Sequence, residues 1–334
     1  MSFPMKRVAT TEEDSPGKRW GGSSIVLEVQ VYNTDTNTGE TAEVPAESVP
    51  SSGGVSQDEI KLLLGHTCKV DLEAKYLRLQ RLEQSSSICV NAGMRRSDGL
   101  SRLNGRRYCI PTEVVLMHKA AGGPELVGKS AAVNLLDWYD VDDVIVLVME
   151  RPILSGNLLR YMNENLDLRD ESKAKIIMKQ LLEAAIDLQK KGVFHRDLKP
   201  ENILIELSPA VPRVRIIDFG SGCIFNNNRY YYLPGTHTHA PPEFLKRGEY
   251  TPGPITVWQL GVLVFEMLDT SRRFSTQGFL KKEIQIKMEL SYECQDLLRR
   301  CLASKPQDRA TLKQLQQHPW LNPTTSTIFD YYFF

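Results

Sequence analysis

The chain has 334 residues, which suits about two domains with interiors large enough to form cores. Lysines plus arginines and aspartates plus glutamates number 41 each, so the zero net charge implies no bulk attraction to nucleic acid or to an anionic membrane. The longest apolar runs, such as residues 144–149, are too short to span a bilayer, and the N-terminus lacks the apolar core of a secretion signal. Six cysteines without Cys-x-x-Cys spacing favour free thiols, and we therefore expect a cytoplasmic or nuclear protein.

The first 72 residues are rich in Ser, Thr, Gly, Glu and Pro, a composition typical of disorder. Only residues 25–32 alternate between apolar and polar side chains as a strand does, and they have no obvious partner nearby. We expect a mostly disordered extension over residues 1–72, a folded domain over 73–321, and a tail over 322–334.

The folded part begins with strand patterns. Residues 76–82 alternate with a period of two, and 88–90 can pair back with them. Residues 93–107 have the composition of a loop, residues 111–120 begin with a proline and predict a helix, and 133–138 and 144–149 predict two buried strands.

From about residue 155 the pattern becomes helical. Residues 173–191 place apolar side chains three to four apart and end at Gly192, and residues 256–268 are apolar enough to form a buried helix. Residues 292–302 and 311–318 predict two more helices. The expected fold class is α+β, with a small β-rich lobe over about 73–150 and a larger helical lobe over about 151–321.

Two motifs carry the chemistry. The run Phe-His-Arg-Asp-Leu-Lys-Pro-Glu-Asn ends at Asn202, and Asp-Phe-Gly begins at Asp218. Asp197 can accept a hydroxyl proton, Lys199 can neutralise charge on a migrating phosphate, and Asn202 and Asp218 offer the oxygen ligands that Mg²⁺ prefers. The alternative is a chance turn and a chance bend, but the order, the spacing and the strand-like runs between them favour phosphoryl transfer.

From residue 74 to 321 the sequence resembles the protein kinase family, and within it the Pim group of serine/threonine kinases. The matching segments are Pro-Thr-Glu-Val-Val-Leu at 111–116, Leu-Leu-Asp-Trp at 135–138, Glu-Arg-Pro at 150–152, Ile-Asp-Phe-Gly-Ser-Gly at 217–222, Pro-Pro-Glu at 241–243 and His-Pro-Trp at 318–320. The resemblance implies a monomer that uses ATP and Mg²⁺ to phosphorylate Ser or Thr in protein substrates.

The resemblance also implies roles for single residues. Those expected to bind the nucleotide are Leu82, Val90, Val133, Met149, Glu150, Leu204, Ile217 and Asp218, although each apolar one is about as readily explained as ordinary core. Pro152 lacks the N–H that most kinases offer to adenine at the hinge. Glu243 and Arg309 resemble the ion pair that ties the activation segment to the helical lobe, with unpaired surface charges as the alternative.

The small lobe departs from the family pattern. Where the family has the glycines of its phosphate loop, this chain has Glu83, Ser85 and Ile88, and no lysine occurs between Lys75 and Lys119. The strand that carries the phosphate-anchoring lysine is therefore missing, although its helix partner, Glu113 by resemblance, is present. Three interpretations stay open: an active kinase, a pseudokinase that serves as a scaffold or weak nucleotide-binding module, and an incomplete gene product.

The resemblance also bears on regulation and on substrates. Arg196 is placed to pair with a phosphate on the activation segment, where Thr236 and Thr238 are the nearest acceptors, but Pim-like kinases do not depend on such a phosphate. Pim-like kinases attract basic peptides with acidic residues, of which Glu201 is kept here. Neutral or basic residues stand at the other expected positions, so we expect a weakened preference for basic substrates.

Overall fold

The computed structural model describes residues 6–7, 26–33, 100–103, 106–141, 144–152, 154–164, 170–207 and 211–322. They divide into two compact units, which are described separately. The first unit contains the residues up to 129 together with 133–153, and the second contains 130–132 together with the residues from 154 onward. The expected α+β class is confirmed, with a small sheet-bearing unit followed by a helical one.

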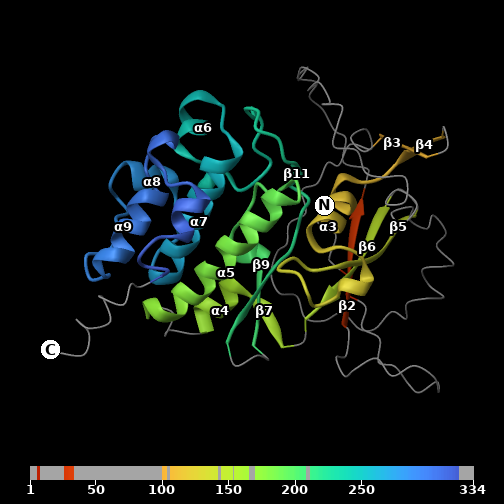
Figure 1. The fold of residues 1–334 in the computed structure, drawn as a ribbon, viewed down its shortest axis with the longest axis horizontal. Helices are drawn as coiled ribbons and strands as arrows, with labels where there is room; N and C mark the ends of the chain where they lie inside the picture. Colours follow the sequence, from red (N-terminus) through yellow and green to blue (C-terminus); the bar gives the residue numbers. More distant parts are fainter. Residues whose placement is uncertain are drawn as a thin grey trace. The chain divides into compact units, whose positions relative to one another are not determined.

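The first unit is built on a four-stranded sheet in the order β1-β2-β6-β5. Strands β2, β6 and β5 of this sheet are labelled in Figure 1. Its strands are β1 (Lys6–Arg7), β2 (Val26–Asn33), β5 (Leu135–Val141) and β6 (Val144–Arg151), and neighbouring strands are antiparallel. Helix α3 (Thr112–Ala121) contacts β5, and a short 3-10 turn, η1 (Pro124–Leu126), follows it. The predicted helix and both predicted buried strands are present.

Two features of the first unit differ from the sequence-based expectations. Strand β2 pairs with β6 along its whole length, from Val26 opposite Arg151 to Asn33 opposite Val144, so the strand-like run at 25–32 does have a partner. The segment expected to be a loop holds a hairpin of β3 (Leu100–Leu103) and β4 (Arg106–Cys109). The Asn-Gly dipeptide between those strands is a strong hairpin signal that composition alone obscured. The strands expected at 76–82 and 88–90 lie outside the described residues.

The second unit is mostly helical (Figure 1). Its helices are α4 (Leu158–Glu164), α5 (Glu171–Lys190), α6 (Pro242–Arg247), α7 (Pro252–Leu268), α8 (Thr276–Leu280), α9 (Tyr292–Cys301) and α10 (Leu312–Gln316). Helix α5 contacts α7 and α10, and α7 also contacts α9. As its composition predicts, α7 is buried almost all around, which makes it the central helix of this unit.

Short strands and 3-10 turns of the second unit flank the two sequence motifs that contain Asp197 and Asp218. Strands β7 (Ser155–Asn157), β9 (Ile203–Glu206) and β10 (Arg213–Ile216) form one antiparallel sheet in the order β10-β9-β7, and β8 (Val193–Phe194) pairs with β11 (Cys223–Ile224). The 3-10 turn η3 (Pro200–Asn202) lies between β8 and β9, η4 (His237–His239) between β11 and α6, and η5 (Pro306–Asp308) between α9 and α10. Helix α5 ends before Gly192, whose φ of +72° is left-handed and suits glycine, and the chain then enters β8.

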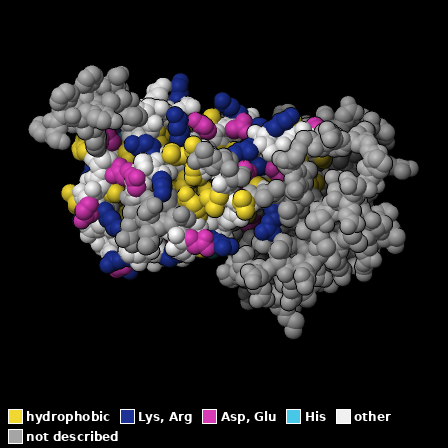
Figure 2. Space-filling model, turned by 90° about the horizontal axis from the view of Figure 1, so that it is seen from below, with side chains coloured by type: hydrophobic (Ala, Val, Ile, Leu, Met, Phe, Trp, Pro, Cys, Tyr) yellow, Lys and Arg dark blue, Asp and Glu magenta, His cyan; other side chains and the backbone are white. Residues whose placement is uncertain are grey.

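Surface composition follows the balanced charge of the sequence. On the face shown in Figure 2, acidic and basic side chains are interspersed, with hydrophobic side chains gathered between them. Within the described part of the chain, no helix is both long enough and apolar enough to cross a membrane.

Candidate active site

The residues between β8 and η3, 195–199, form a loop anchored by a buried histidine. The ring of His195 is 3% exposed, its Nδ1 accepts from the N–H of Asp197 at 3.3 Å, and its Nε2 lies 3.1 Å from the carbonyl oxygen of Ile217. This geometry fits a neutral ring with its proton on Nε2. Burial lowers the pKa of His195, although the nearby Asp218 and Asp197 oppose the shift. The neutral side chain of His195 thus links the loop that carries Asp197 to the segment that leads into Asp218.

Asp197, the candidate base, is buried and surrounded by donors. Its Oδ2 lies 2.7 Å from Nζ of Lys199, and its Oδ1 accepts from the N–H of Thr236 at 2.8 Å. Burial alone would raise the pKa of Asp197, but the charge and hydrogen bond of Lys199 and the Thr236 N–H outweigh it, so the pKa is lowered. The carboxylate therefore stays ionised at neutral pH, as an acceptor of a hydroxyl proton must be.

Lys199 has a second partner that sequence reasoning missed. Its Nζ donates to Oγ1 of Thr236 at 3.1 Å, so the lysine bridges the candidate base and the activation segment. The sequence suggested Thr236 only as an acceptor of a regulatory phosphate. In the structure its hydroxyl oxygen accepts from Lys199 and its N–H donates to Asp197, the two residues nearest the expected chemistry. The only signal in the sequence was its place between the Asp-Phe-Gly motif and the Pro-Pro-Glu motif.

Asn202 and Asp218, the candidate metal ligands, are brought together by the backbone. The N–H of Ile217 donates to the carbonyl oxygen of Asn202 at 3.0 Å, which sets Asp218 one residue away. Nδ2 of Asn202 donates to the backbone oxygen of Asp197 at 3.0 Å, so the amide oxygen is the atom left to act as a ligand. Asp218 has a left-handed φ of 64°, and its Oδ1 accepts from the N–H of Gly220 at 3.2 Å.

These two residues fit Mg²⁺ as part of a nucleotide complex. Within the described residues, no group of three or more His, Cys, Asp or Glu side chains is arranged to hold a metal by itself. Mg²⁺ needs few protein ligands, because waters and phosphate oxygens complete its octahedron. One amide oxygen and one carboxylate therefore match a metal that arrives with ATP.

Arg196 already has partners on the activation segment. Its Nε donates to the carbonyl oxygen of Ser221 at 2.6 Å and its Nη2 to that of Gly222 at 3.0 Å, and its guanidinium lies 6.0 Å from the ring centroid of Tyr230. The left-handed φ of 67° at Arg196 is uncommon for this residue type. The arginine that the resemblance places opposite a phosphate on the activation segment is held here by backbone carbonyls.

The expected ion pair of Glu243 and Arg309 is present and buried. Nη1 of Arg309 donates to Oε1 of Glu243 at 2.8 Å, and Nη2 donates to Oε2 to complete a bidentate pair. Arg309 also donates to the carbonyl oxygens of Ala303 and Pro254, and its guanidinium lies 4.9 Å from the ring centroid of Trp258. These contacts tie the start of α6 to α7 and to the segment after η5.

The expected nucleotide-binding residues fall in both units. In the first unit Val133 and Met149 are buried, and Oε2 of Glu150 accepts from the N–H of Asn134 at 3.0 Å. In the second unit Ile217 is buried and Leu204 is half-buried. The remaining two, Leu82 and Val90, lie outside the described residues, as do the positions of the missing glycines. Glu113 is 1% exposed on α3.

Glu201, the acidic residue kept from the Pim pattern, lies beside an arginine of the same unit. Nη1 of Arg273 is 3.8 Å from Oε1 of Glu201 and 3.9 Å from Oε1 of the buried Glu266. Burial raises the pKa of Glu266 and lowers that of the neighbouring His239. One guanidinium is therefore shared by two carboxylates.

Comparison with known proteins agrees with this geometry. Residues 110–321 match the protein kinase domain, and the chain belongs to the protein kinase family, whose members use ATP and a divalent metal ion. Serine/threonine-protein kinase pim-2 of Danio rerio is 30% identical over 285 residues, 80% of this chain and 91% of that protein, which confirms the resemblance to the Pim group.

Two further relatives match over a smaller share of the chain. Serine/threonine-protein kinase prk-2 of Caenorhabditis elegans is 27% identical over 230 residues, 67% of this chain and 50% of that protein. An Aurora kinase of Yarrowia lipolytica is 32% identical over 196 residues, 56% of this chain and 51% of that protein. The chain spans about half the length of these two relatives.

Proposed function

We propose that the chain is a serine/threonine protein kinase similar to the Pim group, transferring the γ-phosphate of ATP to Ser or Thr hydroxyls of protein substrates. The observation that carries the proposal is the arrangement around Asp197, whose Oδ2 lies 2.7 Å from Lys199 and whose Oδ1 accepts from Thr236. An ionised carboxylate with one oxygen next to a cation can take the proton of an attacking hydroxyl.

In this mechanism the side chains have separate tasks. Asp197 orients the acceptor hydroxyl and receives its proton as the oxygen bonds to the γ-phosphorus and ADP leaves. Lys199 stabilises the negative charge that builds on the transferred group. Asn202 and Asp218 would hold Mg²⁺, which supplies neutralisation of the phosphate charge when it is bound.

Substrate preference follows from the charge near Glu201. Because Arg273 already lies 3.8 Å from this carboxylate, a basic side chain of a substrate gains less there than at an open acidic site. The proposal therefore includes a weak preference for basic peptides. It also includes a monomer located in the cytoplasm or nucleus, a location that the free thiols of Cys223, Cys294 and Cys301 support.

A pseudokinase scaffold is the second candidate function, and one observation favours it. No lysine lies between Lys75 and Lys119, and Glu83, Ser85 and Ile88 replace the glycines of the phosphate loop. Without that lysine the nucleotide loses a principal electrostatic contact, so we expect weak binding of ATP with Mg²⁺ and a low rate of transfer. An incomplete gene product predicts the same deficits, and a transcript with a lysine-bearing strand between codons 83 and 110 would identify it.

Asp197→Asn separates the two candidates. A kinase should label Ser- or Thr-containing peptides slowly from radiolabelled ATP and Mg²⁺, and the variant should lower that rate by about 10²- to 10⁴-fold while remaining folded at the assay temperature. Equal labelling by both proteins would refute the enzyme. No labelling, together with a Tm that rises with ATP only when Mg²⁺ is present, would favour the nucleotide-binding scaffold.

A further inference from the structure

Gln259 is a polar residue in the interior of the most buried helix of the second unit. It lies in α7 between the apolar residues Trp258 and Leu260, and it is only 5% exposed. A buried amide is costly unless its donor and its acceptor both find partners. The partners of Gln259 therefore show what this side chain does in the helix.

Both partners belong to the loop that carries the candidate base. Nε2 of Gln259 donates to the carbonyl oxygen of Arg196 at 2.7 Å, and Oε1 accepts from the N–H of Leu198 at 3.4 Å. These two residues are the immediate chain neighbours of Asp197. One side chain thus bonds the peptide groups before and after the base.

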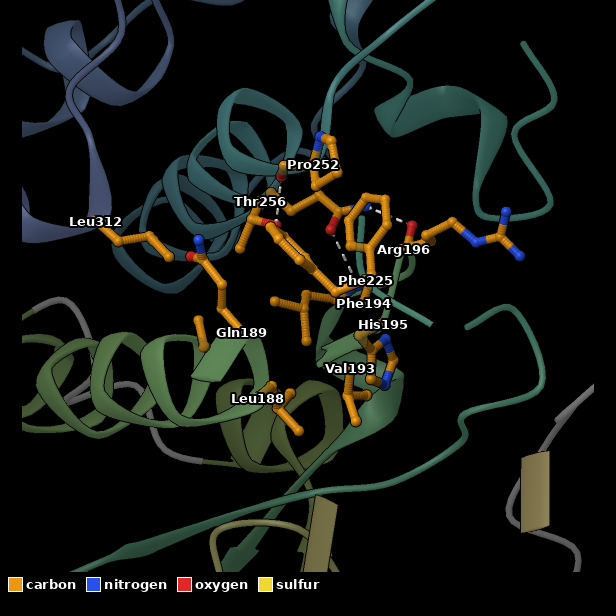
Figure 3. Close-up of a pocket in the computed structure, with 13 residues that line it drawn as sticks. Leu188, Gln189, Val193, Phe194, His195, Arg196, Phe225, Pro252, Thr256 and Leu312 are labelled. Carbon is orange, nitrogen blue, oxygen red and sulfur yellow. Dashed lines mark hydrogen bonds between the residues drawn. The ribbon is translucent and has the colours of Figure 1, made fainter. Parts of the chain in front are cut away.

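The rest of α7 offers the loop no equivalent contact. Thr256 lies almost one turn earlier in the same helix, but its hydroxyl donates to the carbonyl oxygen of Pro252 at 2.8 Å, as Figure 3 shows. Between the helix and the loop is a cavity of ≈ 20 Å³, lined by Thr256, Gln259 and the loop residues His195 and Arg196 among others. The side chain of Arg196 extends away from this cavity, toward the activation segment (Figure 3). In the described part of the chain, Gln259 is the α7 side chain that hydrogen-bonds residues 195–199.

We propose that Gln259 is a positioning residue for Asp197, acting as an amide clamp on the two peptide groups that flank the base. The clamp holds the loop where Arg196 has its uncommon φ of 67°, a conformation that needs support from its surroundings. It acts through the backbone and touches neither substrate nor nucleotide. The catalytic part of this inference rests on the proposed kinase function, and the structural part does not.

An amide of this length satisfies both bonds at once. Methionine has a similar volume, but it has no hydrogen-bond donor and its sulfur is only a weak acceptor. An ionised glutamate can accept from the N–H of Leu198 but has no proton to donate to the carbonyl oxygen of Arg196. Displacement of a catalytic group by about 1 Å costs up to about 100-fold in rate, so we expect Gln259→Met to lower kcat by about 10- to 100-fold. KM for peptide and for ATP should change less than twofold, because the binding surfaces are untouched.

Thr256→Val provides the matched control. It removes a hydrogen bond from the same helix and the same cavity wall but breaks no contact with the loop, so kcat should stay within about twofold of the starting protein. Hydrogen exchange gives a readout independent of catalysis. The amide of Leu198 should exchange faster in Gln259→Met, while Thr256→Val should leave it unchanged.

Gln259→Glu adds a test by pH and serves as the main test if Gln259→Met does not fold. Burial raises the pKa of a carboxyl group, and the protonated acid regains a donor for Arg196. The kcat of this variant relative to the starting protein should therefore be low at pH 8 and recover toward pH 5.5. A merely structural role predicts a ratio that does not change with pH.

Each of these experiments has a result that would overturn the proposed role of Gln259. Unchanged kcat and unchanged Leu198 exchange in Gln259→Met would overturn it, as would an equal loss in Thr256→Val or a pH-independent ratio in Gln259→Glu. If the starting protein transfers no phosphate, the proposed function fails and the exchange of Leu198 alone decides. Faster exchange there in Gln259→Met then supports the clamp, and unchanged exchange refutes it.

Discussion

The buried pair of Glu243 and Arg309 should control the stability of the helical unit. The side chain of Arg309 is 0% exposed and that of Glu243 is 8% exposed, so neither charge is solvated by bulk water. Arg309→Gln would leave the carboxylate of Glu243 buried without its cation. It would also remove donors from the carbonyl oxygens of Ala303 and Pro254, which Arg309 contacts at 2.9 and 3.0 Å.

The size of the effect follows from burial. Removing one partner of a buried ion pair costs about 3–5 kcal/mol, because the other charge stays desolvated. For a domain of this size each kcal/mol shifts the Tm by about 2–4 °C, so the Tm of Arg309→Gln should fall by about 6–20 °C. Glu243→Gln should cost less within this range, since a glutamine oxygen can still accept one hydrogen bond from the guanidinium.

An exposed pair of the same chemistry is the control. Arg229 donates to both carboxylate oxygens of Glu249 at 3.0 and 3.1 Å, but its side chain is 65% exposed. Arg229→Gln should therefore cost no more than about 1 kcal/mol in urea unfolding. Equal losses for Arg229→Gln and Arg309→Gln would refute the argument that burial sets the magnitude, and so would a double variant at Glu243 and Arg309 whose loss equals the sum of the singles.

Two further predictions concern the surroundings of Asp197. The lowered pKa of this carboxyl stabilises the fold above pH about 4 and ceases to do so as the pH falls through it. Lys199→Met should raise this pKa, so its deficit in Tm should be largest above pH about 5 and shrink toward pH 3; a deficit that is constant with pH would contradict the assignment. Gly235→Ala places a Cβ 2.8 Å from the carbonyl oxygen of Arg196 and 3.0 Å from Oδ1 of Asp197, and it should lower both kcat and Tm. Gly253→Ala meets nothing within 4 Å and should leave both nearly unchanged, and similar losses in the two alanine variants would argue against a close-contact effect.

Motifs and periodicity determined the class of the protein and most of its helical unit. The order of Asp197, Asn202 and Asp218 along the chain was enough to expect one site, because each lies in a motif whose residue types serve one reaction. Helix α7 was predictable because a run of apolar residues too long for a strand must be buried, and the end of α5 because Gly192 takes a left-handed φ. These features could be predicted because each depends on residues that are close together in the sequence.

Tertiary structure alone decided the contacts between distant segments. Strand β2 pairs with β6 across more than 100 residues, and period-two alternation does not say which strand a segment will join. The hydroxyl of Thr236 reaches Lys199, and the amide of Gln259 reaches both neighbours of Asp197 from 61 and 63 residues away. Threonine and glutamine are common surface residues, so their types carry no signal. Their roles arise from which buried donors and acceptors the fold places within hydrogen-bond distance.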